Sequence, residues 1–371
     1  MKFRFNIYSI FIFFSLSLAR ISLAQHGCDI DSIMRYKGFW KKVSDDLMRP
    51  GPYQAKVINR IDKFQKILKD AYPDQRGTEA HWSRNMAGYA VLKNGPIPYE
   101  LTVGLFVCYC SAETKKVEPF DETGTWVYIY FNQFNWFMDK MEDLIIENNP
   151  VYLLRKRAGD LNGFPLYEGV YNETTNLGTQ YSRTVLISRS GQVPYIPVTK
   201  KEYLKAFVEH MEREKAKSLQ ELNHSWEYNS KEDKEKQKRI KEILPNTNFD
   251  SLEKLDKEEF SKSIKNSNQE FDELIKPAKE LLLSMREEEG ESPALLYNEY
   301  SGEFKGFATE GRGGRMAVRL NKDYINMGLM KDVPQFLVIY WSWDVLKPTS
   351  YWRDQLEKNL DFNTIRQLLD K

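Results

Sequence analysis

The chain has 371 residues, with 54 lysines and arginines against 53 aspartates and glutamates, so its formal net charge is +1 at pH 7. This balance argues against a nucleic-acid-binding protein, because such proteins usually carry a clear basic excess. Three cysteines are too few for a fold held together mainly by disulfides.

The first 24 residues have the three-part layout of a secretory signal peptide. Residues 1–4 include two basic side chains, residues 5–19 are almost wholly apolar, and Ser22 and Ala24 place small residues before Gln25. The apolar segment is shorter than the roughly 20 residues that span a bilayer, which disfavours the alternative of an uncleaved anchor. We therefore expect a secreted or periplasmic protein with no stable membrane insertion after the signal is cleaved.

The next part of the chain predicts two helices, then strands, then a helix. Residues 29–49 predict a short helix, and apolar side chains at three- and four-residue steps predict a longer one over residues 53–71. Residues 99–111 and 125–131 are rich in β-branched and aromatic side chains and predict strands. Both faces of the second strand are apolar, so we expect it to be central in a sheet that is covered on each side. Residues 134–146 predict another helix.

Two further strands are predicted at residues 164–171 and 180–188, separated by a polar turn. A helix is then expected to begin at Thr199, because Glu202 three residues later gives the spacing of a capping box.

Residues 200–290 differ sharply in composition from the rest of the chain. They contain 19 basic and 22 acidic residues among 91, with few apolar positions, which is typical of solvent-exposed helices. A second helix of this arm is expected to begin at Asp250, with Glu253 as its capping partner. Pro277 is expected to break or restart that helix near Lys276.

Strand-forming sequence returns after the arm, at residues 294–307, 316–320 and 335–343, and residues 350–369 predict helical turns. These elements predict an α+β fold in which an antiparallel sheet is covered by helices and carries a long charged helical arm. The predicted organisation is a signal peptide (1–24), an α+β domain (25–199), the arm (200–290), and a C-terminal part (291–371) that completes the sheet or forms a second small domain.

A glycine-rich string with two arginines, GRGGR at residues 311–315, is the most unusual short motif. Its glycines allow backbone N–H groups to form an anion-binding concavity, and Arg312 and Arg315 would add paired donors for a carboxylate, sulfate or phosphate. The alternative, which we favour, is a glycine-rich turn between two strands.

Tryptophans and tyrosines cluster in three segments of the sequence, and Trp126 and Trp341 stand in two of the predicted strands. On an open sheet face these rings would bind sugars or peptide side chains. The alternative, which we favour, is that they fill the core between the sheet and its helices.

Cys28, Cys108 and Cys110 are the three cysteines. Cys108 and Cys110 share one face of a predicted strand, with Cα atoms roughly 6.6 Å apart, which is at the far edge of disulfide geometry. A bond from Cys28 to one of them, with the other thiol buried, is one prediction. The alternative is that two or three cysteines are unpaired and packed in the core.

No recognised catalytic, nucleotide-binding or zinc-binding motif is present in the sequence. Glu221 and His224 have the Glu-x-x-His spacing of di-iron helical bundles, but those sites need two such pairs. The sequence therefore predicts no metal and no cofactor.

Residues 193–204 (VPYIPVTKKEYL), residues 321–324 (NKDY) and residues 334–336 (PQF) resemble segments of uncharacterised secreted proteins of Bacteroidota-type bacteria. The resemblance covers about a fifth of the chain. It implies an exported bacterial protein in which a strand leads into a capped helix, and it implies no activity and no site residue.

The leading functional hypothesis is an exported protein with a binding or structural role, in which residues 200–290 contact or space a protein partner. Whether the chain is an enzyme stays open. The alternative is a hydrolase or lectin that acts on an extracellular polymer through an aromatic-lined groove.

Overall fold

The structure is a computed structural model that describes residues 28–371, except 46, 87–89, 176–177, 246–247 and 298–302. The predicted signal peptide and its cleavage site lie outside the described residues. The chain divides into two compact units. Unit 1 contains the described part of Met1–Asp139 together with Arg155–Tyr195 and Asn321–Lys371, and unit 2 contains Lys140–Leu154 and Ile196–Leu320.

Unit 1 is built on a sheet in which nine described strands are ordered β1-β2-β3-β5-β14-β10-β9-β8, with β4 paired to β3. β1 and β2 are parallel, and the other neighbouring strands in this order are antiparallel. The strands are β1 (Trp40–Lys42), β2 (Thr78–Asn85), β3 (Tyr99–Cys110), β4 (Val117–Pro119), β5 (Trp126–Phe131), β8 (Arg157–Leu161), β9 (Phe164–Thr175), β10 (Gly178–Ile187) and β14 (Leu337–Asp344).

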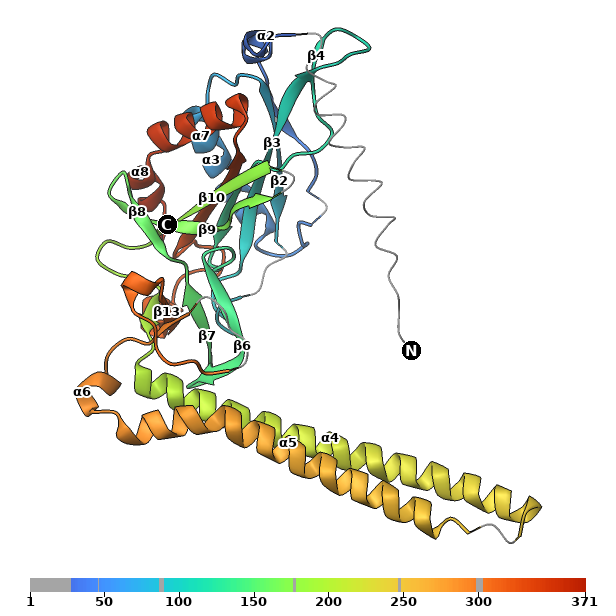
Figure 1. Cartoon of the computed structure of the whole chain (residues 1–371). Coiled ribbons are helices and arrows are strands. Elements are labelled where there is room, and N and C mark those ends of the chain that lie inside the picture. The colour runs from blue at the N-terminus through green and yellow to red at the C-terminus, as the bar shows by residue number, and fades with distance from the viewer. Residues whose placement is uncertain (1–27, 46, 87–89, 176–177, 246–247, 298–302) are drawn as a thin grey trace. The chain divides into compact units, whose positions relative to one another are not determined.

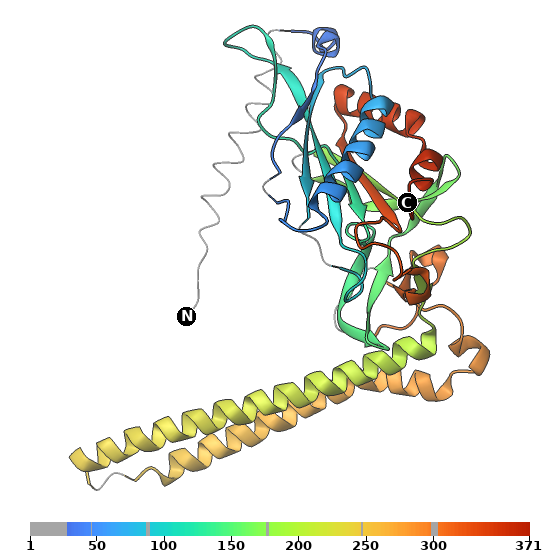
Figure 2. The same ribbon diagram turned by 180° about the vertical axis from the view of Figure 1, so that it is seen from behind.

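Three helices, α3 (Gln54–Ala71), α7 (Lys347–Asn359) and α8 (Phe362–Arg366), lie on one face of this sheet (Figures 1 and 2). The apolar stripe that predicted α3 is buried as expected and packs with alternate residues of β3, β5 and β14. The short helix α2 (Ile30–Arg35) precedes them and has no buried residue. The predicted α+β class is thus confirmed, and β5 is central, between β3 and β14.

Unit 2 combines a small sheet, ordered β11-β13-β7-β6 with β12 paired to β13, with the helical arm. Its elements are β6 (Met138–Ile146), β7 (Asn149–Leu154), β11 (Tyr195–Pro197), α4 (Lys200–Ile243), α5 (Asp250–Ser284), α6 (Glu287–Gly290), β12 (Leu295–Leu296) and β13 (Arg315–Leu320). The first turns of α4 and the last turns of α5 pack on this sheet through a separate apolar cluster. The predicted capping box is confirmed, because Thr199 and Glu202 exchange side-chain and backbone hydrogen bonds.

The helix predicted for residues 134–146 is wrong, because Met138–Ile146 forms strand β6. Glu147 and Asn148 both have positive φ angles, 49° and 60°, which is the backbone of a tight hairpin turn into β7. The apolar side chains at positions 134, 137, 138 and 141 also fit a helical period, so the hairpin partner decided the structure.

Other predicted boundaries also change. Of the residues described between 29 and 49, only Ile30–Arg35 is helical, and Trp40–Lys42 instead joins the sheet beside β2. Among the described residues of the strand predicted at 294–307, only Leu295–Leu296 is a strand.

In the arm, α5 has Phe249 at its N-cap without a side-chain cap bond, and it continues through Pro277. Ile275 and Ala278 are buried on either side of the proline. We infer that this packing offsets the backbone hydrogen bond that Pro277 removes.

Candidate functional site

The most unusual feature of unit 2 is the hairpin formed by α4 and α5, which lie side by side in Figures 1 and 2. The two helices contain 44 and 35 residues. At 1.5 Å per residue, they are about 66 and 52 Å long.

The half of the hairpin nearest the sheet is held by specific contacts between the helices. Lys215 Nζ lies 2.7 Å from Asp272 Oδ1, and Lys279 Nζ lies 2.6 Å from Glu212 Oε1. One helical turn further out, the hydroxyls of Ser218 and Ser267 are 3.3 Å apart. These contacts fix the antiparallel register of the helices.

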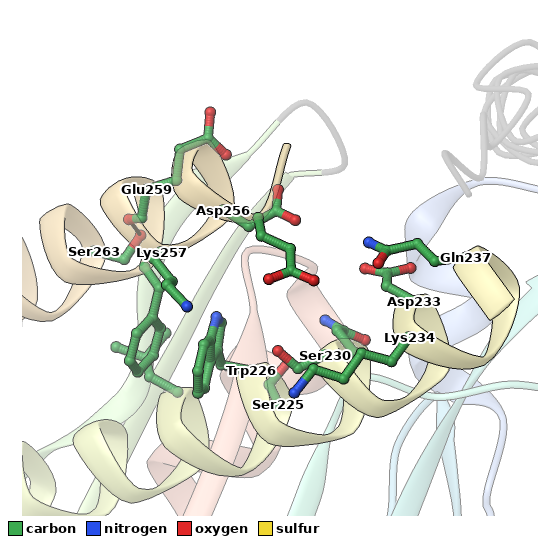
Figure 3. Close-up of a pocket in the computed structure, with 14 residues that line it drawn as sticks. Ser225, Trp226, Ser230, Asp233, Lys234, Gln237, Asp256, Lys257, Glu259 and Ser263 are labelled. Carbon is green, nitrogen blue, oxygen red and sulfur yellow. Dashed lines mark hydrogen bonds between the residues drawn. The ribbon is translucent and has the colours of Figure 1, made fainter. Parts of the chain in front are cut away.

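The outer half of the hairpin encloses a pocket of about 380 Å³ between the two helices (Figure 3). Trp226 and Phe260 line this pocket, and their rings stack on each other with centroids 4.7 Å apart and planes 18° from parallel. The other lining side chains are mostly polar or charged and include Asn229, Asp233 and Asp256. A single aromatic pair therefore stands among polar groups where a helical hairpin usually has a continuous apolar seam.

Burial falls off steeply along the hairpin. The buried residues of α4 are confined to its first twelve, Lys200–Met211. Beyond them, no described side chain of α4 is buried, and in α5 none of those described before Ile275 is. At the outer end, Ile243 is 78% exposed and Leu244 is 60% exposed. We refer to residues 219–266 as the distal arm.

The two arginines of the GRGGR string do not form a paired anion site. Arg315 is buried, and its Nε and Nη2 donate to the carbonyl oxygens of Leu154 and Leu153 at 3.0 and 2.9 Å. Arg312 is exposed, at the end of a 3₁₀ turn that Gly313 closes with φ of 78°. The paired-donor hypothesis is therefore wrong for Arg315, whose guanidinium ties β13 to the end of β7.

We expect Arg315→Met to lower the free energy of unfolding of unit 2 by about 2–3 kcal/mol, because two buried carbonyls lose a charged donor. Arg312→Met is the matched control and should change it by less than about 0.5 kcal/mol. Urea unfolding followed by far-ultraviolet circular dichroism measures both, and equal effects would contradict the structural role of Arg315.

Trp341 is not a ligand platform, because its side chain is only 1% exposed and belongs to the core of unit 1. Its Nε1 donates to Glu357 Oε1 at 3.0 Å, and Arg183 pairs with the same carboxylate at 2.7 Å. This corrects the prediction of Trp341 as a binding residue.

Trp126 is half-buried on the other face of the sheet. A Cβ atom added to Gly104 would come within 2.9 Å of its indole, so the glycine lets the ring lie directly on β3. Its Nε1 donates to Thr123 O at 3.1 Å, and Tyr128 stacks beside it with centroids 5.8 Å apart. The ring is thus fixed by its neighbours and remains partly accessible.

A disulfide joins Cys28 to Cys110, with Cα atoms 5.6 Å apart, and Cys108 is a buried free thiol. Burial raises the pKa of Cys108 to about 12, which leaves very little thiolate at neutral pH. The three cysteines line an apolar pocket of about 350 Å³ together with side chains such as Ile33 and Phe120.

His81 lies far from Cys108 along the sheet. The amide of Cys108 bonds the carbonyl of Gly77, whereas His81 pairs with Gly104, four residues earlier on β3. This register offsets the backbones of the two residues by about 13 Å along the strands, a long separation for a nucleophile and its base. His81 instead packs against Phe106, with ring centroids 4.4 Å apart and planes tilted by 37°.

The sequence did not identify Trp226 and Phe260 as a candidate site. Its signal was present: Trp226 lies at the end of the apolar stripe of the first arm helix, within a strongly charged segment. Nothing in the sequence pairs it with Phe260, 34 residues later, until the hairpin register is known.

Within the described parts of the chain, no helix combines the length and apolar character that crossing a membrane requires. Comparisons with protein-family models, curated proteins and solved structures found no match for this chain.

Proposed function

We propose that the protein is exported and has a non-enzymatic role, and that the helical arm at residues 200–290 is its protein-contact element. The observation that carries this proposal is the distal arm. It extends about 38 Å from the contact between Ser218 and Ser267 to the end of α4, and most of its described residues are exposed.

Long helices in proteins owe most of their stability to packing of an apolar face, since helix propensity alone is marginal in water. The base of the arm has such packing, through buried residues such as Phe207, Met211 and Ile275. In the distal arm, the rings of Trp226 and Phe260 stack between the helices, and Phe249 is the one described side chain that is buried. A protein that packs along this segment would supply the missing burial.

Export is supported by the signal-like leader and by the disulfide between Cys28 and Cys110. Disulfides persist mainly in oxidising compartments, such as the bacterial periplasm or the extracellular space.

The alternative, a hydrolase or lectin acting on an extracellular polymer, has weaker support. Trp126 keeps a partly accessible ring, whereas Trp341 is in the core. On the face of Trp126, Glu79 of β2 and Glu100 of β3 stand six positions apart in the β2–β3 register, about 20 Å. Glycosidase carboxylates are about 5–9.5 Å apart, so these two do not form such a pair.

A shortened arm tests the proposal. Because the Ser218 and Ser267 hydroxyls are 3.3 Å apart, a four-residue turn can replace residues 220–266 and preserve the packed base. We expect this variant to fold but to lose the proteins that tagged full-length chain retains from the native compartment, including untagged copies of itself. Trp226→Ala removes the aromatic pair but leaves the arm at its full length. This variant therefore distinguishes the contribution of the ring pair to partner binding from the contribution of arm length. An unchanged partner set with the shortened arm would overturn the proposal.

A further inference from the structure

The two arm helices carry opposite net charges. Counted over their full lengths, α4 has 12 basic and 10 acidic residues, a net charge of +2, and α5 has 6 basic and 9 acidic residues, a net charge of −3. The contrast is strongest near the outer end. Residues 231–241 have six basic and three acidic side chains, net +3, and residues 250–259 have two basic and five acidic, net −3.

These opposite charges do not neutralise each other across the hairpin. Within the described residues of these two segments, each ion pair stays inside one helix: Lys236 with Glu232 at 3.0 Å and with Asp233 at 3.8 Å, and Lys254 with Glu258 at 3.9 Å. The ion pairs between the helices lie at the packed base instead. The outer segments therefore present complementary charge to another molecule.

We infer that the partner of the distal arm is a second copy of the same arm, and that two hairpins form a four-helix bundle. In a bundle with a twofold axis along the arm, each α4 lies between its own α5 and that of the second copy. Positive and negative helices then alternate around the bundle, and like-charged helices occupy the diagonals. Each α4 meets the α5 of the other copy, so the two copies make the same contacts with each other, as an isologous interface requires.

The available surface is large enough for such a dimer. The distal part of α4 is about 38 Å long, and two helices side by side are about 20 Å wide. One face of the hairpin therefore offers about 760 Å² per copy, close to the roughly 800 Å² per partner of a standard stable interface. Pairing would also shield Ile240, Ile243 and Leu244, which are exposed at the outer end.

This inference rests on the proposed role of the arm in protein contact, and charge-reversed variants test it separately. One variant carries Lys231→Glu, Lys234→Glu and Lys238→Glu, which makes the net charge of 231–241 −3. The other carries Asp256→Lys, Glu258→Lys and Glu259→Lys, which makes the net charge of 250–259 +3. All six side chains are exposed.

By sedimentation equilibrium, we expect the mature chain to have twice the monomer mass and each variant alone to be a monomer, with association weakened by more than about tenfold. An equimolar mixture of the two variants should recover the dimer, because each α4 again meets an oppositely charged α5 in the other chain. Charge pairing confined to one hairpin cannot produce this recovery. Higher salt should also shift the unmodified chain toward monomer.

The control reverses three exposed lysines of unit 1, Lys41, Lys63 and Lys69, to glutamate, and it should leave the dimer intact. Circular dichroism must show unchanged helix content in every variant. A monomeric unmodified chain, or a mixture that stays monomeric, overturns the inference. If self-association fails in this way but the variant with the shortened arm still loses another bound protein, the proposed contact role of the arm stands without self-association.

Discussion

Replacing Cys28 and Cys110 with alanine should lower the free energy of unfolding of unit 1 by about 4 kcal/mol. The bond links positions 82 residues apart, and a cross-link that closes so long a loop removes much entropy from the unfolded chain. Helix α2, which follows Cys28, buries no residue of its own. The covalent bond therefore restrains a segment that has little buried surface of its own.

Urea unfolding followed by tryptophan fluorescence measures this loss, because only Trp226 of the eight tryptophans belongs to unit 2. Cys108→Ala is the matched control, since it removes a buried thiol and keeps the disulfide. Its cost should be about 1 kcal/mol. A double alanine variant no less stable than this control would contradict the prediction.

Arg60→Met should destabilise unit 1 by about 3–5 kcal/mol, because it leaves a buried carboxylate without its counter-charge. The side chain of Asp332 is 0% exposed, and Arg60 Nη2 lies 2.9 Å from its Oδ2. Asp332 also anchors the sheet, since its carbonyl accepts the Tyr99 hydroxyl at 2.9 Å. The pair thus joins helix α3 to the segment that leads into β14.

Lys66→Met, on the same helix, removes the exposed pair between Lys66 and Asp70, whose side chains are 73% and 62% exposed. That change should cost less than about 1 kcal/mol, because solvent screens exposed ion pairs. The same fluorescence-monitored urea unfolding compares the two variants. Similar decreases in the free energy of unfolding for both variants would show that the burial of Asp332 does not determine the effect of losing Arg60.

Local sequence signals succeeded where one segment carries all the information. The capping box of Thr199 and Glu202 is formed by residues three apart, and the buried stripe of α3 follows its own helical period. The central position of β5 also followed from its own sequence, since both its faces are apolar.

The sequence failed where a distant segment decides between two local solutions. Phe134, Phe137 and Met141 fit a helix, but the hairpin with β7 makes the segment around Met138 a strand. Arg315 looked like a surface donor beside Arg312, and strand pairing buried it against the carbonyls of β7. The sequence does not distinguish Trp341 from the other aromatic residues. Only the folded chain places its indole where Nε1 donates to Glu357.

By itself, the amino-acid sequence determined the α+β class and the position of the charged helical arm, because charge density and apolar periodicity act over short stretches of chain. The tertiary structure alone decided which cysteines pair, which arginine is buried, and that Trp226 meets Phe260. These outcomes depend on the register between segments tens of residues apart, and many alternative registers satisfy the same local preferences until the whole chain packs.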